Sequence, residues 1–240
     1  MPGPTEAAQS QSRAEGMVQA LAKSLRELAR LYPPVPPTTD PLALIIWENV
    51  GYLIPDDRRQ NLFEELAQRV GLDAAPLADA PHDILFDIAR RGGMRPADRV
   101  ERLRHIGRLA LEAGGDLASA LRIASPTKAR TLLKRFPGIG DPGADKILLF
   151  SGVETRPALD SNGVRAMVRL GHATEGASYA QAYRSAVSAL RDLGPPDRER
   201  LIEAFHVLRA HGQVSCKRSA PLCLSCSLDA ACAHTATKGL

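Results

Sequence analysis

The chain has 240 residues, of which 44% are hydrophobic, and carries 31 Lys and Arg against 27 Asp and Glu, a net charge of +4. This length and hydrophobic content exclude a largely disordered chain and suffice for one large domain or two smaller ones. It has no run of eighteen apolar residues, and its first forty residues contain no signal peptide, so we expect a cytoplasmic protein without a membrane partner.

The N-terminal region predicts a disordered segment followed by two helices. Residues 1–16 are small and polar without hydrophobic periodicity, so we expect them to be disordered. Apolar residues at helical spacing over 17–31 predict a helix, which the proline-rich segment 32–41 ends. Asp40 is a good N-cap and Pro41 suits the first helical position, so the next helix is expected to begin there.

Further helices are predicted between this region and residue 125. Their apolar residues recur at helical spacing, and glycines or prolines separate them, in the segments 55–70, 80–91, 96–113 and 116–123. No convincing run of alternating β-branched residues occurs. The sequence therefore predicts an all-α fold in which helices pack against their sequence neighbours.

The segment 125–150, SPTKARTLLKRFPGIGDPGADKILLF, predicts two apolar helices joined by a turn at Pro137-Gly138-Ile139-Gly140. Two glycines allow a tight turn with exposed backbone N–H groups, and the second helix adds the positive end of its dipole. Such a turn suits the binding of a nucleic-acid phosphate whatever the base sequence. An ordinary connection between two helices remains the alternative interpretation.

All four cysteines lie near the C-terminus with the spacing C-x6-C-x2-C-x5-C, at Cys216, Cys223, Cys226 and Cys232. In a reducing cytoplasm, clustered cysteines are more often metal ligands than disulfides. Structural zinc sites usually pair their ligands in two C-x2-C units, whereas only the middle two cysteines form such a pair here. The spacing therefore favours a [4Fe-4S] cluster, with zinc and a disulfide as the alternatives.

Between the hairpin and the cysteines lies the segment ALDSNGVRAMVRLG, in which Asp160 precedes a helical pattern. An N-cap is the usual role of an aspartate at such a position. The order of the three motifs, over about residues 40–232, resembles the endonuclease III branch of the helix-hairpin-helix (HhH-GPD) DNA glycosylase superfamily. The resemblance implies a base excision repair enzyme that flips a damaged or mismatched base and cleaves its N-glycosidic bond.

The resemblance also implies a two-part, all-α fold. We expect a helical barrel domain over 41–156 that contains the hairpin 125–150, and a cluster subdomain made of 17–40 and 157–240. Double-stranded DNA is then expected in the cleft between them, with Asp160 at its floor. The implied protein is a monomer that acts at the nucleoid.

Residue roles follow from the resemblance position by position. Asp160 occupies the catalytic aspartate position, where it would stabilise the oxocarbenium-like sugar as the base leaves. Lys217 and Arg218 fall in the loop between the first two cysteines and would face the DNA backbone. The hairpin residues expected to contact DNA are Pro137, Gly138, Ile139, Gly140, Pro142 and Gly143.

The chain departs from endonuclease III at the position of the lysine that attacks the sugar and allows strand cleavage. Pro142 stands there and has no nucleophile, so we expect a monofunctional hydrolase. Lys146 lies one turn further along the same helix face, and a bifunctional glycosylase and lyase that uses this relocated amine is the runner-up. A DNA-binding module without catalysis is the alternative from another class.

Other positions resemble the adenine and mismatch glycosylases of this branch. Asn162 stands where the strand-cutting enzymes have histidine, and Glu48 aligns with the glutamate that protonates or positions the departing base. Protonation would require a carboxyl that keeps its proton near neutral pH, which partial burial beside Trp47 would favour. Tyr52 or Leu53 would fill the gap left by the flipped base, unless both are core residues.

Overall fold

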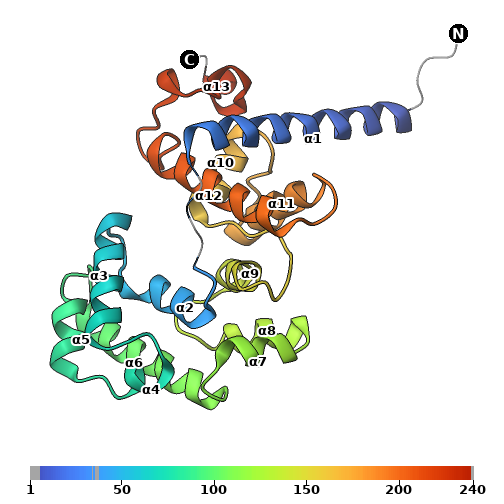
Figure 1. Ribbon diagram of the computed structural model, residues 1–240. Helices are drawn as coiled ribbons and strands as arrows, with labels where there is room; N and C mark the ends of the chain where they lie inside the picture. Colours follow the sequence, from blue (N-terminus) through green and yellow to red (C-terminus); the bar gives the residue numbers. More distant parts are fainter. Residues whose placement is uncertain (1–5, 34, 36–37, 239–240) are drawn as a thin grey trace, which may run out of the picture. The chain divides into compact units, whose positions relative to one another are not determined.

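The computed structural model describes residues 6–33, 35 and 38–238, which form helices and loops without a β-strand. The all-α expectation is confirmed. The chain divides into two compact units, a terminal unit (residues 1–36 and 155–240) and a central unit (residues 37–154). Both are drawn in Figure 1. No helix among the described residues is long and apolar enough to cross a membrane.

The central unit is built from eight consecutive helices: α2 (Pro41–Val50), α3 (Asp56–Arg69), α4 (Ala74–Ala78), α5 (His82–Ala89), α6 (Pro96–Glu112), α7 (Leu117–Ile123), α8 (Pro126–Leu133) and α9 (Asp141–Phe150). The expected start of α2 is confirmed, because the Asp40 carboxylate accepts a hydrogen bond of 2.7 Å from the Ala43 amide. Only α4 is missing from the prediction, since five residues are too short to show periodicity.

The core of the central unit forms around α2 and α6. Helix α2 is almost entirely buried, and most of its buried side chains are leucine, isoleucine and valine. Helix α6 packs against α4 and α5. Gly107 on α6 allows the closest of these contacts, because a Cβ there would collide with the backbone of Ala74 and Ala78. Helices α4 and α6 thus pack almost backbone to backbone.

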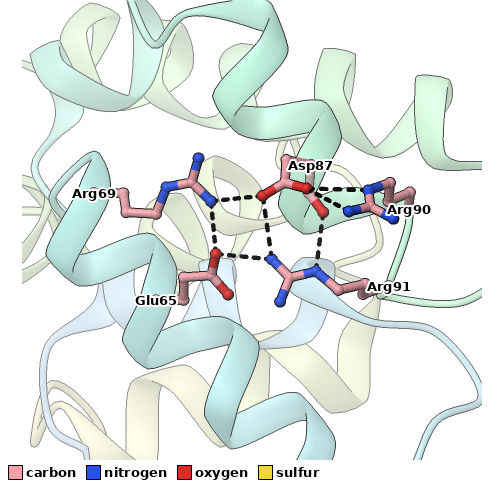
Figure 2. Close-up of polar contacts among 5 residues, drawn as sticks. All are labelled: Glu65, Arg69, Asp87, Arg90 and Arg91. Atoms are coloured by element: carbon pink, nitrogen blue, oxygen red, sulfur yellow. Dashed lines mark hydrogen bonds and ion pairs between the residues drawn. The ribbon is translucent and has the colours of Figure 1, made fainter.

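Five charged side chains join α3 to α5 at the surface of the central unit (Figure 2). Asp87 accepts hydrogen bonds from Arg69 (2.7 Å) and Arg90 (2.7 Å). Glu65 accepts from Arg69 (2.6 Å) and Arg91 (2.7 Å). The hydrogen bond from Arg69, followed by that from Arg90, lowers the pKa of Asp87 to about 2. Both carboxylates are therefore charged near neutral pH, and the network holds α3 against α5.

The terminal unit combines the first helix with the C-terminal part of the chain. Its elements are α1 (Glu6–Leu31), α10 (Ser161–Leu170), α11 (Tyr179–Arg191), α12 (Arg198–Val214), the short 3-10 helices η1 (Cys223–Ser225) and η2 (Asp229–Ala231), and α13 (Ala233–Lys238). Leu21 and Leu28 of α1 join a core formed mainly by α10, α11 and α12. Gly212 brings α12 against α10, where a Cβ would lie 2.6 Å from the Asn162 carbonyl oxygen.

The expectation of disorder over residues 1–16 is wrong for residues 6–16, which belong to α1. Residues 1–5 lie outside the described residues. The segment contains alanine, glutamate, glutamine and arginine, all good helix formers. Extending a helix that already exists at 17–31 adds one hydrogen bond per residue and needs no new nucleus. In Figure 1 this half of α1 extends beyond the rest of its unit.

We predict that Asp87→Asn lowers the urea midpoint of unfolding at pH 6 and that this difference shrinks at low pH. The pKa of Asp87 lies at about 2, below its ordinary value of 3.8, so its ion pairs stabilise the fold above pH 3.8. This stabilisation is lost as the pH falls from 3.8 toward 2. Asp83→Asn, which changes an exposed aspartate of α5 outside the network, serves as the control; equal effects of the two variants would contradict the prediction.

Candidate functional site

Asp160 caps α10 and is held by side chains from two helices. Its Oδ1 accepts hydrogen bonds from the amides of Asn162 (2.9 Å) and Gly163 (2.8 Å), so the ordinary N-cap role is present. Its Oδ2 accepts from Asn162 Nδ2 at 3.0 Å and lies 3.2 Å from Arg209 Nε of α12. These contacts fix the orientation of the carboxylate. The sequence did not predict the role of Arg209, because no pattern near either residue indicates that it contacts Asp160.

Tyr179 at the start of α11 lies within the electrostatic influence of Asp160. Tyr179 is 48% exposed, and its partial burial, followed by the charge of Asp160, raises the pKa of the phenol. The phenol therefore keeps its proton and remains a possible donor. Tyr179 and Ser161 line a groove of about 710 Å³ in the terminal unit, together with Arg165, Arg169 and Arg218. Glu175 also lines the groove, but the three arginines outnumber it and make the groove suitable for an anion.

A continuous chain of hydrogen bonds connects Asp160 with the first cysteine. Asn162 donates to Asp160 through Nδ2 and accepts through Oδ1 from Arg165 Nη2 at 2.8 Å. Arg165 Nε donates to the Cys216 carbonyl oxygen at 2.9 Å, and its Nη2 donates to the Gly212 carbonyl oxygen at 2.6 Å. The candidate catalytic carboxylate and the cysteine segment are thus parts of one hydrogen-bonded assembly.

The four cysteines line a single pocket in the terminal unit, and all four thiols are free. The disulfide alternative is therefore not found. Burial raises the pKa of the Cys226 thiol. In the described part of the chain, no three His, Cys, Asp or Glu side chains come close enough together to hold one metal ion. Four soft sulfur donors that line one pocket are suited chemically to an iron-sulfur cluster or a zinc ion.

Arg169 of α10 anchors the loop that follows the first cysteine. Its Nη1 lies 3.6 Å from Cys216 Sγ and donates to the Lys217 carbonyl oxygen at 2.6 Å. Its Nη2 donates to the Arg218 carbonyl oxygen at 3.2 Å, and its own carbonyl accepts from Cys232 Sγ at 3.2 Å. Lys217 and Arg218 are themselves exposed. The loop backbone is fixed while its two basic side chains face solvent.

The hairpin turn between α8 and α9 is fastened to α2. Asn49 is buried and donates from Nδ2 to the carbonyl oxygens of Ile45 and Pro137, both at 2.9 Å. Gly138 has a φ of +74°, a left-handed conformation that favours glycine. Gly140 is the N-cap of α9, whose first amides have no acceptor within the helix. The turn therefore presents backbone donors in a fixed place.

The other hairpin residues are placed as follows. Pro142 lies in the first turn of α9, and Gly143 follows it, half-buried. Ile139 is only 5% exposed, and its amide donates to the Phe136 carbonyl oxygen at 3.2 Å. Its side chain and its amide are therefore used inside the turn. Ile139 therefore anchors the hairpin, and its expected role in DNA binding stays a prediction.

Glu48 and Lys146 form an ion pair within the central unit. Lys146 Nζ of α9 donates to Glu48 Oε1 of α2 at 2.7 Å, and the lysine side chain is only 12% exposed. Lys146 Nζ also lies 5.9 Å from the centre of the Phe150 ring. The ion pair therefore joins α2 to α9 and is largely shielded from solvent on the lysine side. Sequence reasoning named both residues but not their pairing.

Three exposed apolar side chains lie at two connected loop tips of the central unit. Tyr52 is 58% exposed, Leu53 77% and Met94 67%. The Tyr52 amide donates to the Gly92 carbonyl oxygen at 2.9 Å, which joins the tips. Leu53 has a φ of +54°, a strained conformation for a branched side chain that proteins keep mainly at functional positions. Sequence reasoning missed Met94, which no local pattern distinguishes from an ordinary loop residue.

Comparisons with known proteins give one sequence relative and several structures of the same fold. No protein-family model matches the chain. A thymine-DNA glycosylase from Aeropyrum pernix is 25% identical over 231 residues, covering 92% of this chain and 96% of the relative. A trapped endonuclease III–DNA covalent intermediate superposes with a TM-score of 0.73 at 18% identity, covering 93% of this chain and 99% of that one.

A second solved structure supports the same assignment of fold. A thermostable thymine-DNA glycosylase superposes with a TM-score of 0.71 at 15% identity and covers 95% of this chain and 99% of that one. The chain therefore has the fold shared by endonuclease III and thymine-DNA glycosylase. The all-α, two-part architecture expected from the resemblance is confirmed at the level of the fold.

We predict that Gly138→Ala destabilises the hairpin by about 1–2 kcal/mol, because alanine resists the left-handed conformation. Its Cβ would also lie 3.4 Å from Asn49 Oδ1. Urea unfolding measures the loss, and faster hydrogen exchange over 125–150 locates it. Gly140→Ala is the matched control, since Gly140 has a φ of −95° and a Cβ there meets only Pro142 Cδ at 3.9 Å. Equal losses in the two variants would disprove the conformational argument.

Proposed function

We propose that the protein is a base excision repair DNA N-glycosylase that flips a damaged or mismatched base and hydrolyses its N-glycosidic bond. The observation that carries the proposal is the Asp160 carboxylate, held at the N-terminus of α10 by two amides, Asn162 and Arg209. The endonuclease III fold and the thymine-DNA glycosylase relative support it. Double-stranded DNA is the proposed partner of a monomeric, nucleoid-associated protein.

Asp160 is proposed to act electrostatically on the reacting sugar. As the bond between C1′ and the base breaks, positive charge develops on the sugar, and a nearby carboxylate lowers the free energy of that state. The base leaves with the electron pair of the broken bond, and water attacks C1′. The proton that the water loses passes to solvent, and the departed base takes up a proton in its place. Arg209 is a positioning residue in this scheme, because its Nε lies 3.2 Å from Oδ2 and fixes the orientation of the carboxylate.

The reaction is proposed to stop at the abasic site. Pro142 has no nucleophile at the position where strand-cutting relatives place lysine. Lys146 pairs with Glu48, and a protonated amine has no lone pair with which to attack the sugar. A bifunctional enzyme remains the second candidate, because transfer of the Lys146 proton to Glu48 on substrate binding would leave a neutral amine.

Glu48 is proposed to position the departing base. Glu48 is bound by Lys146 at 2.7 Å, and in this proposal its carboxylate accepts a hydrogen bond from a base N–H. General-acid catalysis by Glu48 stays a prediction, and it requires that the pair accept a proton when the base binds. Its proximity to Asp160 likewise rests on the resemblance.

DNA binding is proposed to use three groups of residues. Backbone amides of the turn at Gly138 and Gly140 and at the start of α9 receive a phosphate. Lys217 and Arg218 contact further phosphates from their fixed loop. Tyr52 and Leu53, together with Met94, enter the DNA base stack at the gap that the flipped base leaves. Insertion there would cover the apolar surface that these side chains expose.

The four cysteines are proposed to hold a [4Fe-4S] cluster, with zinc as the alternative. Their common pocket and free thiols support this proposal. When bound, such a cluster would tie the segment 216–232 into one rigid body. Arg165 and Arg169 then connect that body to α10, which carries Asp160 at its start.

We predict that Asp160→Asn reduces base release by on the order of 100-fold or more while duplex binding changes by no more than a few-fold. Asparagine caps helices as well as aspartate does, so the fold of α10 survives the loss of charge. Single-turnover release and electrophoretic mobility shift measure the two effects. The control is Asp197→Asn, which changes another aspartate N-cap, at α12. A non-catalytic module would show no release in the parent protein.

We predict strand breaks only after hot alkali when the protein acts on duplexes containing uracil, thymine opposite guanine, oxidised pyrimidines, hypoxanthine or adenine opposite 8-oxoguanine. The name of the sequence relative makes thymine the first base to test. Breaks without alkali, together with a covalent adduct trapped by borohydride, would establish lyase activity. Loss of that adduct in Lys146→Met would then identify the amine.

A further inference from the structure

His211 presents a buried polar atom that the proposed reaction does not use. The residue lies on α12 and is 2% exposed. Its Nδ1 is buried and has no hydrogen-bond partner among the residues that the structure describes. The backbone of His211 is used, since its carbonyl oxygen accepts from the Cys216 amide at 2.8 Å. The side chain therefore lies next to the first cysteine while one ring nitrogen remains without a partner.

The surroundings of His211 indicate which group supplies the missing partner. His211 lines the same pocket as the four cysteines. Nearby hydroxyl groups are already engaged: Ser215 Oγ lies 3.3 Å from the Tyr32 hydroxyl, and Thr235 Oγ1 donates to the Cys232 carbonyl oxygen at 2.8 Å. A buried polar atom without a partner is costly, so such atoms usually face a group that satisfies them. The pocket also contains Asp229, whose Oδ1 accepts from the Ala230 amide at 2.6 Å, and His234, and neither is a hydrogen-bond partner of His211 Nδ1. The four cysteine sulfurs are the further acceptors in the same pocket.

Resting on the proposed cofactor, we propose that His211 donates a hydrogen bond from Nδ1 to a sulfur of the cysteine-bound [4Fe-4S] cluster and thereby raises its reduction potential. Hydrogen bonds to sulfur are among the factors that set the potentials of such clusters. A donor stabilises the reduced form more, because that form carries more negative charge on sulfur. Arg169 Nη1, 3.6 Å from Cys216 Sγ, would be a second donor, from α10.

The test compares the midpoint potential of the cluster in three variants with that of the parent, by voltammetry of the purified proteins. His211→Phe keeps a ring beside Tyr32 but removes the N–H, so we expect a shift to more negative potential. His211→Asn places an amide N–H near the position of Nδ1 and is expected to restore most of the shift. His172→Phe, which removes a half-buried ring that contacts Ser24, should leave the potential unchanged.

The outcomes distinguish a failure of the proposed role of His211 from a failure of the proposed [4Fe-4S] cluster. Iron and acid-labile sulfide are measured first, and their absence from the parent protein would contradict the proposed cofactor. A cluster that is present but keeps its potential in His211→Phe would overturn the role of His211 alone. An equal shift in His172→Phe would do the same, because it would show a general effect of losing a ring.

A second measurement covers the case in which His211→Phe does not fold. The parent protein, labelled with 15N-histidine, is reduced and studied by electron spin-echo envelope modulation. We expect weak modulation from a histidine nitrogen, and the label should change its frequency. No histidine modulation would overturn the proposal. Strong coupling, typical of nitrogen bound directly to iron, would also overturn it, because His211 would then be a ligand.

Discussion

The hydrogen bonds along α10 are the interaction on which the terminal unit depends. The first turn of this helix is closed by Asp160, its middle is joined to α12 and the first cysteine by Arg165, and its last turn holds the basic loop through Arg169. One helix of ten residues therefore organises the candidate catalytic group and the candidate cofactor pocket together. The N-cap and catalytic interpretations of Asp160 are compatible, because capping uses mainly one carboxylate oxygen.

Most of the helices follow from short-range chemistry that a sequence displays. Asp40 before Pro41 marks the start of α2, and Ser125 before Pro126 marks the start of α8, because caps and proline act within a few residues. The N-terminal extension of α1 shows the opposite case. Residues 6–16 form no apolar stripe, so hydrophobic periodicity does not predict a helix there. The residue types nevertheless favour the extension of a helix that is already nucleated.

The features of the site that sequence reasoning missed are contacts between distant segments. Arg209 reaches Asp160 from α12, and Lys146 reaches Glu48 from another helix of the central unit. Motif reasoning could name Asp160 and Glu48, since each stands at a fixed offset from a recognisable pattern. It could not supply the cationic neighbour of each carboxylate, because that neighbour depends on how the helices pack. The role of Glu48 changes most, since its partner is a cation.

The loop after the first cysteine is held by its backbone. Arg169 binds the carbonyl oxygens of Lys217 and Arg218, and the side chains of these two residues take no part in that contact. Every amino acid has a carbonyl group, so the identity of the two side chains is separate from the shape of the loop. Substitutions at these two positions, in evolution or by protein engineering, can therefore change the exposed side chains without changing the conformation of the loop.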